Sequence, residues 1–194
     1  GNLAGSNAQG AQSVAIGQSA GKVSQGAYST AMGFEAGSGD QGANSVAVGV
    51  NAGRNSQGDN STAIGRSAGE VSQGATAVAV GYLAGSNAQG GQSIAIGRSA
   101  GEVSQGDNTT AVGYLAGSNA QGDYGVAIGV AAGRASQATN SVAVGRDAGS
   151  NAQGTQAVAV GYLAGNADQG ASSVAIGVAA GSNSQADNSV AVGI

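Results

Sequence analysis

The chain of 194 residues contains no cysteine, histidine, proline or tryptophan. Without cysteine it has no disulfide framework and no thiolate metal site. Without histidine it has neither a histidine-based catalytic triad nor a histidine metal site. Aromatic residues make up 3% of the sequence and glycine supplies 38 residues, which excludes an ordinary core of large side chains. The absence of proline is expected where nearly every backbone N–H joins a hydrogen-bonded ladder.

Charge is scarce too, with a formal net charge of −4. Basic residues are scattered rather than clustered, so we expect no nucleic-acid partner. They are Lys22, Arg54, Arg66, Arg98, Arg134 and Arg146. No apolar run approaches the roughly 20 residues that span a bilayer, so we expect no membrane insertion by this segment. No pair of carboxylates recurs as general acid–base catalysis requires, so we predict no enzymatic activity and no cofactor.

What the sequence does contain is a strict sixteen-residue repeat, without insertion or deletion. Glycine occupies every sixteenth position from Gly17 to Gly193, alanine from Ala15 to Ala191, and glutamine from Gln25 to Gln185. A fixed period of this length indicates stacked supersecondary units that each contact only their neighbours. Because the repeat runs to both ends, we expect residues 1–194 to form a single array that is an excerpt of a longer fibrous protein.

Each repeat holds a segment such as Ser13-Val14-Ala15-Ile16-Gly17, in which β-branched residues alternate with small ones as in a strand. Two short strands and two glycine-containing corners fit in sixteen residues. The fold class predicted is all-β, a β-solenoid or parallel β-roll of about twelve coils, spaced by ~4.8 Å. The predicted core consists of the β-branched columns: Val14, Ile16, Val46, Val48, Val78, Val80, Ile94, Ile96, Val142, Val144, Val174 and Ile176.

The opposite face of the same strand carries alanine in every repeat. Only a small side chain lets another backbone approach closely, so we predict that this face lies at the axis of a symmetric homo-oligomer. The predicted oligomer face comprises Ala15, Ala47, Ala79, Ala95, Ala111, Ala143 and Ala175. The invariant glutamine column predicts an amide ladder, in which each amide bonds to the next coil or to a turn carbonyl.

Motif searches add little chemistry. One G-x-G-x-x-G match lies at residues 37–42, but no βαβ unit surrounds it, and we interpret it as chance. Asp107 and Asp123 share a column one coil apart, where like charges repel and could recruit a cation; a solvated pair is the preferred interpretation. We predict no metal site. The period and recurrent aspartate of calcium-binding nonapeptide rolls are absent.

Several repeats carry the hexapeptide Asn-Ser-Val-Ala-Val-Gly, at residues 44–49, 140–145 and 188–193. These segments resemble the N-S-V-A-I-G repeat of trimeric autotransporter adhesin heads of the YadA-like type. The resemblance covers the whole chain. It implies a left-handed parallel β-roll that packs as a homotrimer on the cell surface and binds a host-surface or matrix ligand. Similar arrays occur in phage and viral fibre proteins, so a virion fibre is an alternative location.

The position after the strand glycine alternates between Arg66, Tyr82, Arg98 and Tyr114 on consecutive coils. At ~4.8 Å spacing a guanidinium can lie over the neighbouring phenol ring, so these residues predict an outer adhesive stripe. We also expect Glu70 and Glu102 to pair with Arg66 and Arg98.

The function predicted is an extracellular structural and adhesive rod. The alternatives are a self-assembling filament subunit, a viral tail-fibre segment and an ice-binding solenoid. Ice binding needs a flat outward row of threonines, whereas Thr30, Thr62 and Thr110 are predicted to face the core.

Overall fold

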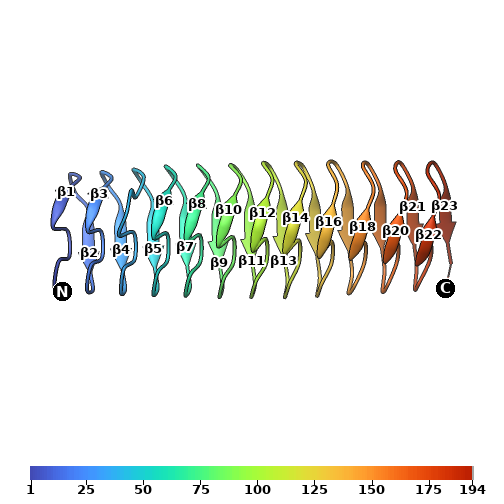
Figure 1. Ribbon diagram of the computed structural model, residues 1–194, viewed down its shortest axis with the longest axis horizontal. Coiled ribbons are helices and arrows are strands. Elements are labelled where there is room, and N and C mark those ends of the chain that lie inside the picture. Colours follow the sequence, from blue (N-terminus) through green and yellow to red (C-terminus); the bar gives the residue numbers. More distant parts are fainter. Residues whose placement is uncertain (194) are drawn as a thin grey trace.

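The computed structural model describes residues 1–193, which form a rod of stacked coils with the two ends of the chain at opposite ends of the rod (Figure 1). Strands on two sides of the rod form parallel sheets along it, and successive strands alternate between the sides except at β4 and β5, which follow one another in the same sheet. Within the described residues there is no helix, and so none long and apolar enough to cross a membrane. The predicted all-β solenoid of about twelve coils is confirmed.

Sheet 1 contains twelve strands, one from each coil. They are β2 (Val14–Ile16), β4 (Thr30–Met32), β5 (Val46–Val48), β7 (Thr62–Ile64), β9 (Val78–Val80), β11 (Ile94–Ile96), β13 (Thr110–Val112), β15 (Val126–Ile128), β17 (Val142–Val144), β19 (Val158–Val160), β21 (Val174–Ile176) and β23 (Val190–Val192). Each residue pairs with its equivalent in the next coil, as Ala95 does with Ala111. This register stacks identical columns directly on one another.

Sheet 2 contains nine strands: β6 (Asn55–Gln57), β8 (Val71–Gln73), β10 (Asn87–Gln89), β12 (Val103–Gln105), β14 (Asn119–Gln121), β16 (Ala135–Gln137), β18 (Asn151–Gln153), β20 (Ala167–Gln169) and β22 (Asn183–Gln185). A separate pair, β1 (Asn7–Gln9) and β3 (Val23–Gln25), precedes it. Between β3 and β6 the coil forms only isolated bridges, through Gln41 to its equivalents on either side. The sheet is therefore interrupted at the third coil.

The interior of the rod is lined by alanine and glutamine. Ala95, at the centre of β11, and Ala100, in the following corner, are both 0% exposed. Gln105, at the end of β12, is 3% exposed. The side chains facing inward from sheet 1 are thus those that the sequence had suggested for an oligomer face.

The two predicted faces of sheet 1 are therefore reversed. The supposed oligomer face is inside the coil: Ala47, Ala79, Ala95, Ala111, Ala143 and Ala175 are fully buried and Ala15 is partly buried. The supposed core points outward: Val14, Ile16, Ile94, Ile96 and Ile176 are exposed, and Val46, Val48, Val78, Val80, Val142, Val144 and Val174 are half-buried. A sixteen-residue coil is too narrow to enclose large side chains from both sheets, so only alanine fits opposite the glutamine amides.

Glutamine links the two sheets across this narrow interior. The Nε2 group of Gln105 donates to the carbonyl oxygen of Ile94 at 3.0 Å, and equivalent bonds of 2.8–3.1 Å recur in the other coils from Gln25 to Gln185. Amide-to-amide contacts are longer: the Nε2 group of Gln105 lies 3.4 Å from Oε1 of Gln121. The glutamine column was predicted to bond to the next coil or to a turn carbonyl, and such bonds occur, as from Nε2 of Gln89 to the carbonyl oxygen of Ser93 at 3.4 Å. The shorter bond across the interior to a strand of sheet 1 was not predicted.

The glycine column at the end of sheet 1 marks a place where neighbouring backbones come close. Gly97 has a φ of +125°, and a Cβ atom there would lie 2.6 Å from the carbonyl oxygen of Gly113. Glycine at this position is required both by the left-handed conformation and by the lack of space.

The strands of sheet 2 do not alternate as the strands of sheet 1 do. In β12 the first two residues lie on the surface and only the third, Gln105, is buried. The reason is that the middle residue, Ser104, has a φ of +53°, and its equivalents in most other coils share this conformation. A left-handed residue in mid-strand rotates the chain so that the glutamine turns inward, while asparagine, valine, alanine and serine side chains cover the outside.

Candidate functional surfaces

The largest surface feature is an apolar face on the outside of sheet 1. It is formed by the outward columns of valine and isoleucine, of which Ile94 is 37% and Ile96 40% exposed. Thr30, Thr62 and Thr110 share the first of these columns and also point outward, so their predicted orientation toward the core was wrong. At ~4.8 Å per coil the face extends over about 55 Å. Soluble monomers rarely expose a continuous apolar strip of this kind.

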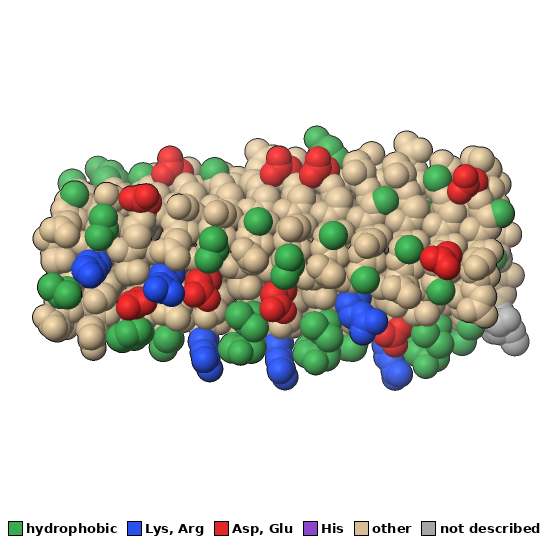
Figure 2. Space-filling model, in the orientation of Figure 1, with side chains coloured by type: hydrophobic (Ala, Val, Ile, Leu, Met, Phe, Trp, Pro, Cys, Tyr) green, Lys and Arg blue, Asp and Glu red, His purple; other side chains and the backbone are tan. Residues whose placement is uncertain are grey.

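A second feature is the stripe of arginine and tyrosine beside the apolar face. The guanidinium carbon of Arg98 lies 5.8 Å from the ring centroid of Tyr82 and 5.5 Å from that of Tyr114. Arg66 lies 5.5 Å from the Tyr82 ring, and a separate contact joins Arg146 and Tyr162 at 4.9 Å. Figure 2 shows basic and apolar side chains alternating along one long edge of the rod. The predicted stacking of guanidinium on phenol is confirmed; its adhesive role stays a prediction.

The expected ion pairs of the stripe are not those observed. Glu70 pairs with Arg54, the equivalent residue of the preceding coil, at 3.5 Å, rather than with Arg66. Over residues 1–193, Arg66 and Arg98 form no ion pair. The two guanidinium groups of the stripe are therefore held by aromatic rings and not neutralised by carboxylates.

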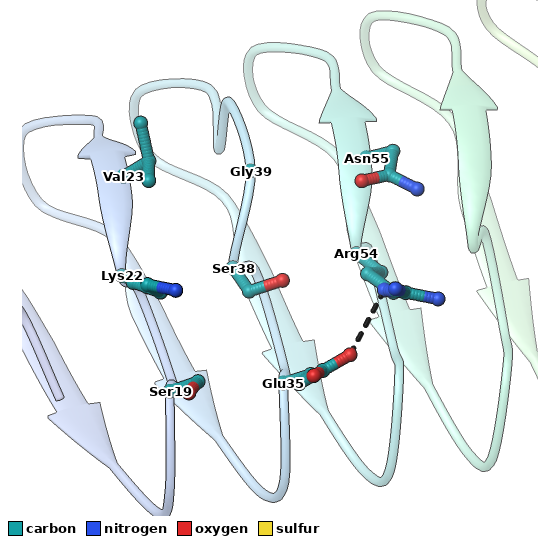
Figure 3. A pocket seen from close by; sticks show the side chains of 8 residues that line it. All are labelled: Ser19, Lys22, Val23, Glu35, Ser38, Gly39, Arg54 and Asn55. Carbon is teal, nitrogen blue, oxygen red and sulfur yellow. Dashed lines mark ion pairs between the residues drawn. The ribbon is translucent and has the colours of Figure 1, made fainter. Parts of the chain in front are cut away.

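A third feature is a pocket at the interruption of sheet 2. It has a volume of about 220 Å³, and its lining includes Lys22, Glu35, Ser38, Gly39 and Arg54 (Figure 3). Glu35 accepts from Arg54 at 3.0 Å across two neighbouring coils. The pocket lies where the G-x-G-x-x-G match runs along the chain, so the segment interpreted as chance does mark a local departure from the repeat.

The sequence contained a signal for this pocket. Gly39 occupies a column in which every other coil has asparagine, valine or alanine. The loss of that side chain leaves Val23 and Asn55 on either side of a gap, about two coils or 9–10 Å apart. The pocket was not predicted from the sequence, because the prediction used the positions that are constant in all repeats and not the positions at which a single repeat differs.

Aspartates in the corner between a strand of sheet 2 and the next strand of sheet 1 accept hydrogen bonds from the backbone of the preceding coil. The backbone N–H of Asp107 donates to Oδ1 of Asp123 at 3.0 Å, and that of Gly91 donates to Oδ1 of Asp107 at 2.7 Å. Asp59 and Asp187 accept in the same way from Ala43 and Ala171. Among the described residues no group of three or more acidic side chains is placed to hold a metal ion. The Asp107–Asp123 pair is therefore a link between coils.

Comparison with known families gives a match along much of the chain, to the YadA head domain repeat. The matched residues are 4–20, 24–52, 41–68, 104–132 and 136–164, which together cover more than half of the chain. No curated protein matches it. The family match, the coil register and the Asn-Ser-Val-Ala-Val-Gly segments agree with one another, and the resemblance seen in the sequence is confirmed. This chain belongs to the family of YadA head domain repeats.

Proposed function

We propose that the chain is an extracellular, non-enzymatic rod of the adhesin type, which self-associates through the outer face of sheet 1 and presents its remaining surface for attachment. The observation that carries this proposal is the continuous apolar face, in which Ile64 and Ile96 are each 40% exposed. Burial of such residues between subunits provides the hydrophobic free energy that the alanine-lined interior lacks.

The partner for this face is a second copy of the chain. Its columns repeat at the spacing of the coils, so an identical rod in parallel offers matching valine and isoleucine side chains along the whole length. Resemblance to YadA-like heads favours three left-handed rods around one axis, on a cell surface or a virion fibre. In this arrangement the alanine columns stay inside each rod, and the valine and isoleucine columns form the core between rods.

The attachment surface in this proposal is the arginine–tyrosine stripe. Tyr82 and Tyr114 are 40% and 44% exposed, and the neighbouring guanidinium groups carry uncompensated positive charge. Aromatic rings and arginine are the side chains that most often dominate binding at protein surfaces. A host-surface or matrix ligand is the class of partner that this stripe suits.

The test is the mass of the assembled protein in solution. We expect light scattering to give three copies for the parent chain. The double variant Ile64→Asp and Ile96→Asp should dissociate, because it places charges in the apolar interface. Val71→Asp, at a position 38% exposed on the outside of sheet 2, is the matched control and should keep the parent mass. A monomeric parent, or a double variant of unchanged mass, would refute the proposal.

A further inference from the structure

The pocket at the third coil lies where isolated bridges through Gln41 replace a strand of sheet 2. In the other coils the column of Gly39 carries a side chain, and from β8 to β20 each strand of sheet 2 pairs with both neighbours, as β10 does with β8 and β12. The backbone of the third coil still bonds to both neighbours: the N–H of Val23 donates to Ser38 at 3.0 Å, and the N–H of Gly39 donates to Arg54 at 2.7 Å. What is missing is a side chain at Gly39, and its absence opens the outer surface of sheet 2 without breaking the coil.

The charges around the pocket are unequal at its two ends. At one end, Arg54 is neutralised by Glu35 at 3.0 Å and by Glu70 at 3.5 Å. At the other end lies Lys22, two coils earlier in the same column as Arg54, which has no ion-pair partner in the described part of the chain. The carboxylate that Arg54 receives from nineteen residues earlier has no counterpart for Lys22, because Leu3 occupies that position.

Between the two cations lies Ser38, whose side chain is drawn pointing along the pocket from Lys22 toward Arg54 (Figure 3). Within residues 1–193 its hydroxyl makes no hydrogen bond. The pocket thus offers a free ammonium at its Lys22 end and, one coil further along, a free hydroxyl. The carboxylate of Glu35 and the amide of Asn55 stand at the other end, and Val23 supplies an apolar wall.

We propose that this pocket binds an acidic monosaccharide unit, such as a uronic acid. Its carboxylate accepts from the ammonium of Lys22 and the hydroxyl of Ser38, and its ring hydroxyls donate to Glu35 and exchange hydrogen bonds with Asn55. A compact anion such as phosphate is disfavoured by Glu35, whose negative charge would lie beside it. A neutral sugar leaves Lys22 without a partner. A sugar acid carries both a carboxylate for the Lys22 end of the pocket and hydroxyls for the Glu35 end.

This pocket is separate from the apolar face of sheet 1, so it stays accessible when that face is covered by other copies. Within residues 1–193 the array has one pocket at a missing strand of sheet 2, and an assembly of several chains would present several of these pockets at one level of the rod. Their combined avidity for an acidic polysaccharide would then exceed the affinity of one site for one sugar unit.

The experiment is a titration of the isotope-labelled full chain, followed through the backbone amide resonances of Ser38, Gly39 and Asn55. Glucuronate is the probe, and glucose and acetate are the comparison ligands. We expect saturable shifts with glucuronate at these amides, and affinities at least tenfold weaker for glucose and for acetate. Acetate binding as tightly as glucuronate would overturn the assignment to a sugar acid, and so would shifts spread evenly over all coils.

The variant that tests the site is Lys22→Ser, since serine occupies this column in several other coils, including Ser86 and Ser118. We expect it to weaken glucuronate binding at least tenfold. Arg134→Ser makes the same change of charge in the same column, away from the pocket, and should bind as the parent does. Equal binding by Lys22→Ser would refute the proposal. Glucuronate shifts that persist in the Ile64→Asp and Ile96→Asp chain separate this result from the outcome of the assembly test.

Discussion

The side-chain amide of Gln105 crosses the interior of its coil and donates to the carbonyl oxygen of Ile94 at 3.0 Å. This contact joins sheet 2 to sheet 1, and its equivalents repeat along the rod. The centre of each coil is thus a hydrogen bond flanked by alanine methyl groups, in place of packed large apolar side chains. A buried carbonyl that loses such a donor carries the cost of its desolvation.

Replacing this amide should destabilise the rod. We expect Gln105→Leu, which keeps most of the volume, to lower the free energy of unfolding by about 0.5–1.5 kcal/mol, because the Ile94 carbonyl loses the hydrogen bond from the amide. In a chain of this length each kcal/mol corresponds to roughly 2–4 °C in Tm. Calorimetry at matched protein concentration is the measurement. Asn87→Ser, at an exposed position of sheet 2, is the control, and an unchanged Tm for Gln105→Leu would contradict the role of the amide.

The sequence predicts the coil but not which side of a strand faces inward. The alternation in Ile94-Ala95-Ile96 shows that the two isoleucines share one face of the strand. The same alternation is expected whether the isoleucine face or the alanine face is buried. The decision depends on the width of the coil, a property of the closed structure. The glutamine column was the available signal, because a buried glutamine opposite valine or isoleucine leaves no room for both.

The stripe could be predicted because its contacts run between identical positions of adjacent coils. Once the register is sixteen, Arg98 must lie one rung from both Tyr82 and Tyr114. Pairing of Glu70 could not be predicted in the same way. It depends on which direction a long side chain takes, and Glu70 reaches Arg54 in its own column.

The glycine that closes each strand of sheet 1 should not tolerate a side chain. In Gly97→Ala the new methyl group would meet the carbonyl oxygen of Gly113 at 2.6 Å, in a left-handed backbone conformation. We expect a loss of several kcal/mol from overpacking and backbone strain together. Circular dichroism during thermal unfolding would report it.

The matched control for this change is Gly91→Ala. A Cβ atom at Gly91 meets nothing closer than 3.6 Å, and alanine stands at the equivalent position of neighbouring coils, as at Ala75. We expect parent-like unfolding. Equal destabilisation by Gly91→Ala and Gly97→Ala would show that glycine content, and not the close approach of two backbones, explains the constant column.

The aspartate link between coils makes a prediction for hydrogen exchange. In Asp123→Ala the backbone N–H of Asp107 loses its acceptor at 3.0 Å, so its exchange should accelerate. Asp123→Asn keeps an acceptor oxygen and should preserve most of the protection. If both variants accelerate exchange equally, the effect of Asp123 is one of charge and not of this hydrogen bond.

The stripe should contribute to stability as well as to attachment. Tyr82→Ser together with Tyr114→Ser removes three contacts, two from Arg98 and one from Arg66. At about 0.5–1 kcal/mol for each exposed cation–π contact, we expect a loss of roughly 1.5–3 kcal/mol in unfolding free energy. Tyr124→Ser is the matched control, because Tyr124 is an exposed tyrosine that stacks on no arginine within residues 1–193.

The same double variant separates a structural stripe from an adhesive one. If Tyr82 and Tyr114 act in attachment, binding of the rod to cells or matrix should fall in the double variant and stay at the parent level in Tyr124→Ser. Arg98→Gln removes the charge and keeps both rings. It should reduce binding too if, in the parent, the rings and the cation contact the ligand together. A double variant that melts earlier and still binds as the parent does would leave the stripe with a stabilising role alone.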